Sequence, residues 1–423
     1  MTGLPTPEFH DPRAKGFRDR TTVDDVLALI DGRIGPPPGC LTPLAGAGGL
    51  VLAEPVVAGV DLPGFDRAAM DGFALRGEET YGADAYAPAV FRVVGRSRPG
   101  LNFDGRVGPG EAVEIATGAP LPDGADTVVP VEATRPDGPD RVAVNEPVAV
   151  GRHVGRRGED VTRGTAVFSA GRVLRPQDLG VLSGLGHGHV LAYPRPKVTI
   201  LVTGDEILAA GSAPDGPRFA DMNSPMLEAL VSRDGGVPRT VGPIPDRREL
   251  LLSLLAAEAA SADALIVSGG TSTGPEDHAP GVVRELGELA VHGVALRPAS
   301  PTGLGFVGKT PVILLPGNPV SCLCGYDLFA GRVVRRLGGR PPGWAYRPVD
   351  RPLAHKLVSA LGRVDYARVR VTDGMVEPLA TGRASALSTT TRADGFVLVP
   401  AGLEGYPAGA SVTVWLYDEV GSG

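Results

Sequence analysis

Residues 197–337 carry the three apolar runs Val198-Thr-Ile-Leu-Val202, Ala264-Leu-Ile-Val267 and Val312-Ile-Leu-Leu315. Each run is short, continuous and rich in β-branched or aliphatic side chains, which is typical of strands covered by helices on both faces. The segments between the runs have apolar residues at helical spacing. We therefore predict an α/β domain with a mostly parallel sheet in this part of the chain.

Each predicted strand is followed by a turn rich in glycine or proline. The turns read Thr203-Gly-Asp-Glu206, Ser268-Gly-Gly-Thr-Ser-Thr-Gly274 and Pro316-Gly-Asn-Pro319. Ligands of open parallel sheets lie beyond the carboxyl ends of the strands. We therefore expect these loops to hold a ligand, and their composition suits a phosphorylated one.

Several residues mark predicted helix starts. Thr22 is expected to cap a first short helix, and Ser224 and Asn318 each precede a proline, as N-cap residues often do. Asp246 with Glu249 resembles a capping box before a leucine-rich run.

The composition limits the class of protein. The chain has 423 residues, a net charge of −7 and 43% hydrophobic residues, which suggests roughly three folding units. Residues 1–20 are polar and lack the hydrophobic middle of a signal peptide, so we expect a disordered leader and a cytoplasmic protein without a membrane span. The absence of a basic tract argues against nucleic acid as a partner.

Two patterns that often carry chemistry are rejected here. The run Gly303-Leu-Gly-Phe-Val-Gly-Lys-Thr310 matches a phosphate loop, but a strand and not a helix follows it, so we predict a hairpin with an exposed Lys309. The hypothesis that the protein is a nucleotide hydrolase depends on this pattern alone. Cys322 and Cys324 lie two apart on a predicted helix, where side chains do not face one another, so we expect structural thiols and not a zinc pair.

Two further parts of the sequence predict β structure. Residues 91–94, 111–116 and 128–131 are expected to form strands of a small β unit. Residues 396–399 and 411–417 alternate apolar and polar side chains between turns, which predicts a C-terminal β module.

Several loops carry polar side chains without any cluster of histidine or cysteine. Those residues are Asp71, Thr117, Asp160, Glu206, Asp246, Asp277 and Arg297. Carboxylates and hydroxyls beside glycine turns suit a hard cation such as Mg²⁺ held against a phosphate or pyrophosphate. The alternative stays open that Asp246 only caps a helix and that Glu206 only serves its turn.

Six motifs occur in order over nearly the whole chain from about Thr21. They are Pro63-Gly-Phe-Asp-Arg-Ala-Ala-Met-Asp-Gly-Phe-Ala74, Ala116-Thr-Gly-Ala-Pro120, Arg157-Gly-Glu-Asp160, Thr203-Gly-Asp-Glu206, Ser268-Gly-Gly-Thr-Ser272 and Leu315-Pro-Gly-Asn-Pro-Val-Ser321. Together they resemble the MoeA family of molybdopterin molybdenumtransferases, which is also seen as the C-terminal part of gephyrin.

The resemblance implies the domain organisation. It places a discontinuous N-terminal unit at residues 21–60 and 155–195, an inserted β unit at 61–154, an α/β molybdopterin-binding domain at 196–340 and a C-terminal β barrel at 341–423. It also implies an elongated homodimer in which the inserted unit of one subunit lies against the α/β domain of the other. Asp71 and Asp277 would then meet across chains.

The resemblance also implies a reaction. It is the Mg²⁺-dependent insertion of molybdate into adenylylated molybdopterin with release of AMP. The implied partners are an upstream adenylyltransferase, which supplies the substrate, and downstream molybdoenzymes, which use the product. The implied catalytic positions are Asp71, Asp160, Asp246 and Asp277, with Asp71 and Asp277 as Mg²⁺ ligands. The implied substrate-binding positions are Thr117, Thr203, Glu206, Ser268, Gly269, Gly270, Ser272, Arg297, Ser300, Pro316 and Pro319.

Two basic positions of the family pattern are absent from this chain. Family members commonly carry Lys-Pro-Gly-Lys-Pro where this chain has Arg297-Pro-Ala-Ser-Pro301, and a lysine where it has Pro280. Carboxylates repel an oxyanion unless cations offset them. Two interpretations therefore stay open: an active transferase in which Arg297 and Mg²⁺ suffice, and a diverged, non-catalytic dimer that binds the pterin nucleotide or acts as a scaffold.

Overall fold

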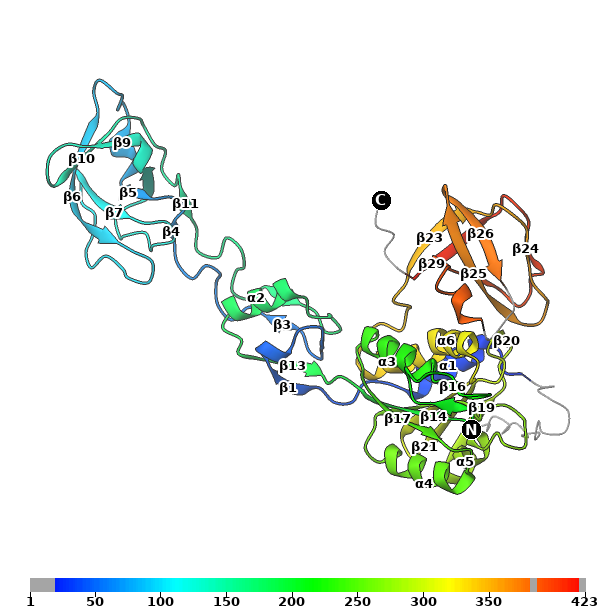
Figure 1. Cartoon of the computed structure of the whole chain (residues 1–423). Helices are drawn as coiled ribbons and strands as arrows, with labels where there is room; N and C mark the ends of the chain where they lie inside the picture. The colour runs from blue at the N-terminus through cyan, green and yellow to red at the C-terminus, as the bar shows by residue number, and fades with distance from the viewer. Residues whose placement is uncertain (1–19, 381–385, 418–423) are drawn as a thin grey trace, which may run out of the picture. The chain divides into compact units, whose positions relative to one another are not determined.

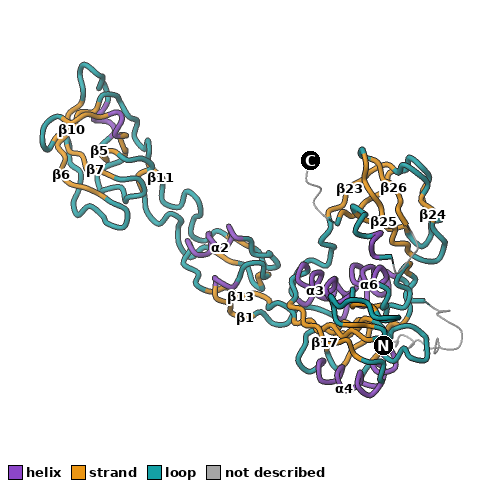
Figure 2. Tube along the Cα trace, viewed as in Figure 1, coloured by secondary structure: helices purple, strands orange, loops and turns teal. Residues whose placement is uncertain are grey.

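The computed structural model describes residues 20–380 and 386–417 (Figures 1 and 2). Of the predicted leader at 1–20, all but Arg20 lies outside the described residues. The chain divides into two compact units. Unit 1 comprises the described residues up to Leu41, Gly49–Ala53 and the described residues from Leu191 onward, and unit 2 comprises Thr42–Gly48 and Glu54–Val190.

Unit 1 contains a six-stranded sheet of order β17-β14-β18-β22-β21-β19. Its strands are β14 (Lys197–Thr203), β17 (Val237–Ile244), β18 (Ala264–Ser268), β19 (Glu288–His292), β21 (Gly303–Val307) and β22 (Thr310–Leu315). The strands β17, β14, β18 and β22 are parallel, which confirms the predicted parallel strands. The strands β21 and β22 form an antiparallel hairpin with Lys309 exposed, so the rejection of the phosphate loop is confirmed.

Helices cover both faces of this sheet (Figure 1). One face packs against α1 (Val23–Arg33), α3 (Asn223–Arg233) and the run α6 (Pro319–Gly325), η5 (Tyr326–Ala330) and α7 (Gly331–Leu337). The other face packs against α4 (Arg248–Ala259) and α5 (Ala279–Leu286). Neighbouring residues of β14 alternate between the two cores, since Ile200 belongs to the first and Leu201 to the second.

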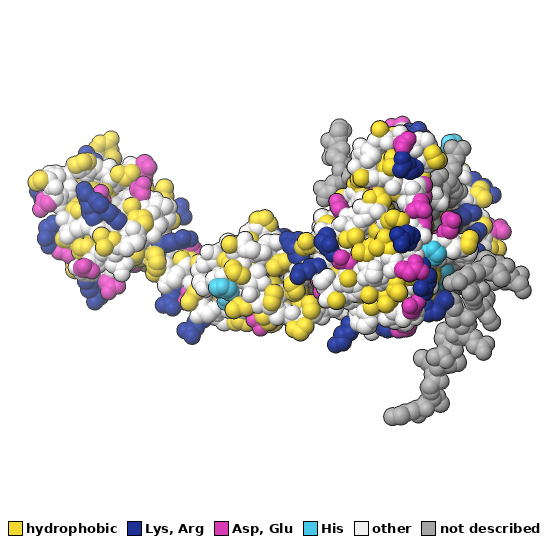
Figure 3. Space-filling view, turned by 60° about the horizontal axis from the view of Figure 1, so that its bottom comes forward, with side chains coloured by type: hydrophobic (Ala, Val, Ile, Leu, Met, Phe, Trp, Pro, Cys, Tyr) yellow, Lys and Arg dark blue, Asp and Glu magenta, His cyan; other side chains and the backbone are white. Residues whose placement is uncertain are grey.

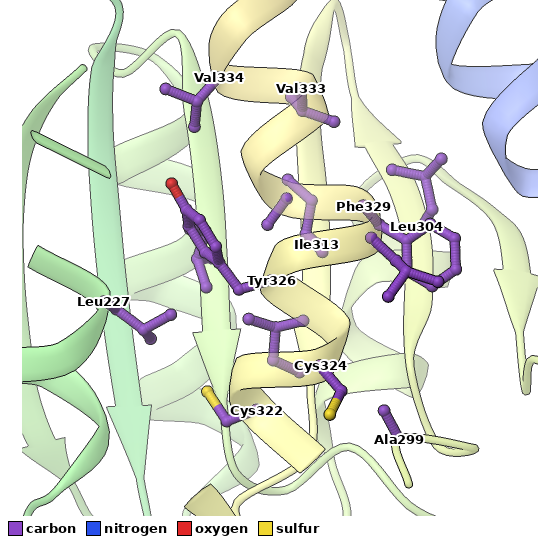
Figure 4. Packing of buried hydrophobic residues seen from close by; sticks show 14 of the residues in the cluster. Leu227, Ala299, Leu304, Ile313, Cys322, Cys324, Tyr326, Phe329, Val333 and Val334 are labelled. Carbon is purple, nitrogen blue, oxygen red and sulfur yellow. The ribbon is translucent and has the colours of Figure 1, made fainter. Parts of the chain in front are cut away.

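The run from α6 to α7 is a buried helix in the first of these cores (Figure 4). Its Tyr326 and Phe329 pack in the same cluster as Leu227 and Ile313. Cys322 and Cys324 are free and buried, and burial raises the pKa of the Cys322 thiol to about 12. Both cysteines therefore serve as small apolar groups, as predicted.

Two predicted helix starts are confirmed and one is wrong. The Thr22 hydroxyl accepts a hydrogen bond from the Asp25 amide at 3.1 Å at the start of α1, and α6 begins directly after Asn318. Ser224 is not the N-cap of α3, because the Asp221 carboxylate accepts from the amides of Asn223 (2.8 Å) and Ser224 (3.0 Å). A carboxylate can accept several hydrogen bonds at once, and the Ser224 hydroxyl donates one to it as well.

The capping box predicted at Asp246 and Glu249 is also wrong. The helix α4 begins at Arg248, and no side chain caps it. The Asp246 carboxylate instead accepts a hydrogen bond from the amide of Asp205 at 3.2 Å, and Asp205 lies in the turn after β14.

The C-terminal module of unit 1 is a small β barrel. Its strands run in the order β26 (Met375–Ala380), β25 (Val364–Thr372), β27 (Gly395–Val399), β29 (Ser411–Leu416) and β23 (Arg347–Pro352). A bridge between Leu353 and Val376 joins the end of β23 to β26 and so closes the sheet. The short strand β20 (Leu296–Arg297) pairs with β25, and β24 (Leu357–Val358) pairs with β28 (Gly405–Tyr406). The predicted C-terminal strands are confirmed.

Unit 2 contains a six-stranded sheet of order β8-β5-β7-β6-β10-β9. Its strands are β5 (Gly72–Leu75), β6 (Ala89–Ser97), β7 (Glu111–Ile115), β8 (Thr127–Pro130), β9 (Thr134–Pro136) and β10 (Arg141–Val144). The three strands predicted here are confirmed. The pair β6 and β7 is parallel, whereas the other neighbours in this sheet are antiparallel.

The remaining elements are short. They are β1 (Cys40–Pro43), η2 (Leu44–Gly46), β2 (Val51–Leu52), β3 (Val56–Val57), β4 (Arg67–Ala68), η3 (Gly77–Thr80), η4 (Val131–Ala133), β11 (Val154–Gly155), β12 (Ala166–Phe168), α2 (Pro176–Gly184), β13 (His189–Tyr193), β15 (Ile207–Leu208), β16 (Phe219–Ala220) and η6 (Leu387–Thr389). None of the helices within residues 20–380 and 386–417 is both long and apolar enough to cross a membrane. Acidic and basic side chains are interspersed over the face drawn in Figure 3.

Candidate functional site

A pocket of about 530 Å³ lies in unit 1 beyond the carboxyl ends of β14, β18 and β22. Most site residues predicted in the α/β domain line it, namely Thr203, Glu206, Asp246, Ser268, Gly269, Gly270, Ser272, Asp277, Pro316 and Pro319. They come together because parallel strands end at one edge of the sheet, so the turn after each strand faces the same space.

The turn after β18 depends on glycine. Gly269 has a φ of +95°, and a Cβ there would lie 2.3 Å from the Thr203 carbonyl oxygen. Its amide donates to the Leu315 carbonyl at 3.2 Å, and the Thr271 hydroxyl donates to the same carbonyl at 3.3 Å. These contacts hold the turns after β14, β18 and β22 close together.

We expect Gly269→Ala to destabilise the protein more than Gly308→Ala. Gly308 also has a positive φ (+60°), but a Cβ there would meet nothing within 4 Å. Gly308→Ala therefore loses only the stability that a left-handed backbone costs a non-glycine residue, about 1–2 kcal/mol. The Gly269 variant adds the clash with Thr203 and should cost about 3 kcal/mol or more. Urea unfolding of both variants measures the difference, and equal costs would contradict the close approach.

Asn223 was missed by the sequence analysis, although it joins two of the turns. Its side-chain amide donates to the Ser268 hydroxyl at 2.9 Å and to the Gly317 carbonyl at 2.8 Å. The Asp221 carboxylate accepts a hydrogen bond from the backbone amide of Asn223, and Asp221, Met222 and Asn223 all line the pocket. The signal in the sequence was an Asp three residues before Ser224, which is the spacing of an N-terminal cap.

The pocket is acidic. The carboxylates of Glu206, Asp221, Asp246, Glu276 and Asp277 line it, and its described lining includes no lysine or arginine. Burial, together with the charges of Asp205, Glu206 and Glu276, raises the pKa of the Asp246 carboxyl. The pocket therefore favours a cation.

The raised pKa of Asp246 predicts a dependence of stability on pH. Because the folded-state pKa lies above the unfolded-state value, ionisation of Asp246 destabilises the fold; the penalty is absent below about pH 4 and complete above the raised pKa. Asparagine carries no such charge. We expect Asp246→Asn to melt about 1–3 °C above the parent at pH 7 and like the parent near pH 3.

Melting curves from pH 3 to pH 7 test this, and a difference that does not vary with pH would contradict it. The same melting curves in the presence of Mg²⁺ provide a second test, because a cation that binds the folded state raises its stability. We expect Mg²⁺ to raise the melting temperature of the parent more than that of Asp246→Asn.

Asp277 lies in the turn before α5 and does not begin that helix. The helix starts at Ala279, and the Asp277 Oδ2 accepts from the Gly274 amide at 2.6 Å within the turn. The other carboxylate oxygen of Asp277 faces no hydrogen-bond donor among the described residues.

Arg297 and Ser300 do not line the pocket, although the neighbouring Pro301 does. The Arg297 guanidinium forms an ion pair with the buried Asp365 of β25. The Ser300 hydroxyl donates to the Val294 carbonyl at 3.2 Å and accepts from Arg20 at 3.0 Å. This turn therefore joins the α/β domain to the barrel.

The other predicted residues lie in unit 2. The Asp71 Oδ1 accepts from the Thr117 amide at 2.6 Å and from the Thr117 hydroxyl at 2.8 Å, and these bonds lower the pKa of the Asp71 carboxyl. Asp160 is exposed, and its amide donates to the Leu62 carbonyl at 3.1 Å. The structure thus brings Asp71 and Thr117 together.

Three family models match the chain in order. They are the MoeA N-terminal region (domain I and II) at residues 21–186, a probable molybdopterin binding domain at 199–336 and the MoeA C-terminal region (domain IV) at 350–417. Together they span nearly all of the described residues.

Similar proteins carry related names. The chain is 34% identical over 376 residues to a putative molybdopterin biosynthesis protein of Methanocaldococcus jannaschii, covering 86% of this chain and 89% of the relative. It is 34% identical over 386 residues to molybdopterin molybdenumtransferase 2 of Mycobacterium tuberculosis, covering 88% of this chain and 94% of that protein.

Solved structures are similar to this chain as well. A molybdopterin biosynthesis MoeA protein from Pyrococcus horikoshii superposes with a TM-score of 0.81 at 30% identity, covering 95% of this chain and 100% of that one. A second structure of MoeA protein from this organism gives a TM-score of 0.76 at 29% identity. The chain therefore belongs to the MoeA family.

Proposed function

We propose that the protein is a molybdopterin molybdenumtransferase of molybdenum cofactor biosynthesis. In the proposed reaction it inserts molybdate into adenylylated molybdopterin, depends on Mg²⁺ and releases AMP. The observation that carries this proposal is the pocket beyond β14, β18 and β22, where the glycine turn at Gly269 and Gly270 lies beside Asp246 and Asp277. Glycine turns of this kind let a phosphate approach the backbone closely.

The residues present suit Mg²⁺ in part. Hard oxygen ligands surround the pocket, and burial together with neighbouring carboxylates raises the pKa of Asp246. No group of three or more His, Cys, Asp or Glu side chains is arranged to hold a metal within residues 20–380 and 386–417. Asp277 would hold Mg²⁺ together with substrate oxygens and water, and bound Mg²⁺ would offset the charge of the phosphates.

The chain's own residues have distinct parts in this proposal. The turn at Gly269 and Gly270 receives the phosphates, and Asn223 keeps that turn aligned with the one after β22. Asp246 accepts from the Asp205 amide through Oδ2, which leaves Oδ1 for a proton. In this proposal Oδ1 takes the proton of the water that cleaves the pyrophosphate link, which is the part of a general base.

One observation favours a second function, a non-catalytic dimer that binds the pterin nucleotide or acts as a scaffold. The described lining of the pocket has no basic side chain, and Arg297 is paired with Asp365. Without a cation, the carboxylates would repel molybdate.

A single assay separates the two functions. Purified protein receives adenylylated molybdopterin, molybdate and Mg²⁺, and AMP is followed by chromatography. The transferase releases AMP only when both molybdate and Mg²⁺ are present. Tight binding of the pterin nucleotide without AMP release would favour the scaffold and refute the transferase.

A further inference from the structure

Unit 2 has its own cluster of polar residues at one edge of its sheet, whose strands β5, β6 and β7 are labelled in Figure 1. Because β6 and β7 are parallel, their carboxyl ends meet at the same edge, so Arg98 follows β6 where Thr117 follows β7. The neighbouring strand β5 is antiparallel to β7 and begins there, directly after Asp71. The strand order thus places Asp71, Thr117 and Arg98 along one edge.

A cavity of about 330 Å³ opens beside these residues. Its walls include the charged side chains of Asp71, Arg96, Arg98 and Glu114 and the apolar side chains of Phe73 and Val131. A second hollow of about 550 Å³ shares Phe73, Arg96, Glu114 and Val131 with it. The site is therefore large enough for more than a simple ion.

The charged side chains of this cavity differ in whether they have partners. Arg96 donates to Glu114 at 2.6 Å, so this pair is internally neutral. Asp71 uses Oδ1 for the two bonds from Thr117. The Arg98 guanidinium is exposed and forms no hydrogen bond or ion pair within the part of the chain that the structure describes.

We propose that this cavity binds a tetrahedral oxyanion, either a phosphate ester or molybdate, and that Arg98 is the residue that contacts it. A guanidinium offers paired N–H donors that match two oxygens of such an ion. This inference rests on the proposed function, which makes oxyanions the substrates. It assigns to unit 2 a cation of the kind that the lining of the pocket in unit 1 lacks.

Calorimetric titration of the full-length protein with AMP, and separately with molybdate, tests the proposal. Loss of a charge-assisted hydrogen bond should weaken binding roughly ten- to a hundredfold in Arg98→Ala, and Arg98→Lys should recover part of it. Arg92→Ala is the matched control, because Arg92 lies on β6, the strand that Arg98 follows, pairs with Glu111 and lines neither cavity. It should bind like the parent.

The two probes distinguish the sources of the oxyanion. A loss for AMP alone assigns Arg98 to the phosphate ester, and a loss for molybdate alone assigns it to molybdate. Unchanged affinity of Arg98→Ala for both probes, or no binding of either probe by the parent, would overturn the proposal.

The outcome is separable from that of the proposed function. A parent that releases AMP while Arg98→Ala binds both probes normally would refute this inference alone. A parent that does not release AMP but binds a probe through Arg98 would refute the transferase alone.

Discussion

Asp277→Asn is expected to lose turnover while remaining as stable as the parent. The Asp277 carboxylate accepts from the Gly274 amide at 2.6 Å, and the amide oxygen of asparagine can accept the same bond. The substitution therefore removes the charge and keeps the turn. A charge that positions a metal ion contributes several kcal/mol to the transition state, so AMP release should fall at least about a hundredfold.

Asp263→Asn is the matched control for this prediction. Asp263 also accepts from a backbone amide, that of Lys197 at 2.7 Å, but it does not line the pocket. Turnover in this variant should equal that of the parent. If Asp277→Asn releases AMP as fast as Asp263→Asn, the catalytic role of Asp277 is wrong.

Hybrid dimers should restore activity to a mixture of two inactive variants. Asp71 lies in unit 2 and Asp277 in unit 1, and we propose a homodimer in which a site takes Asp71 from one subunit and Asp277 from the other. A hybrid of Asp71→Asn and Asp277→Asn chains would then hold one undamaged site. Random exchange should recover about a quarter of the parent activity, because half of the dimers are hybrids with one site of two intact.

Differently tagged chains allow the exchange to be verified before AMP release is measured. Each variant alone serves as the control and should stay inactive after the same treatment. Verified exchange without recovery would mean that both residues serve one subunit's site or that the protein is not this dimer.

The fold of unit 1 could be predicted because its signals are local. Continuous apolar runs such as residues 264–267 indicate buried strands wherever they occur, and the turns that follow them must share one edge of a parallel sheet. The apolar run after Thr310 likewise decided between a phosphate loop and a hairpin. In each case the deciding residues are neighbours in the sequence.

The features that the sequence did not reveal depend on distant contacts. Arg297 appeared available for an oxyanion, but its partner Asp365 follows 68 residues later. Asn223 joins turns that lie 45 and 94 residues further along the chain. Asp246 matched a local capping pattern, but its carboxylate accepts a hydrogen bond from the amide of Asp205, which lies 41 residues earlier in the chain.

The most direct test of the transferase is the stoichiometry of one turnover. Protein loaded with adenylylated molybdopterin is given molybdate and Mg²⁺, and both the AMP released and the molybdenum bound to the pterin are quantified. The account predicts about one molybdenum inserted for each AMP released, because one substrate yields both products. AMP released without molybdenum insertion, or a nucleotide that stays intact, would contradict it.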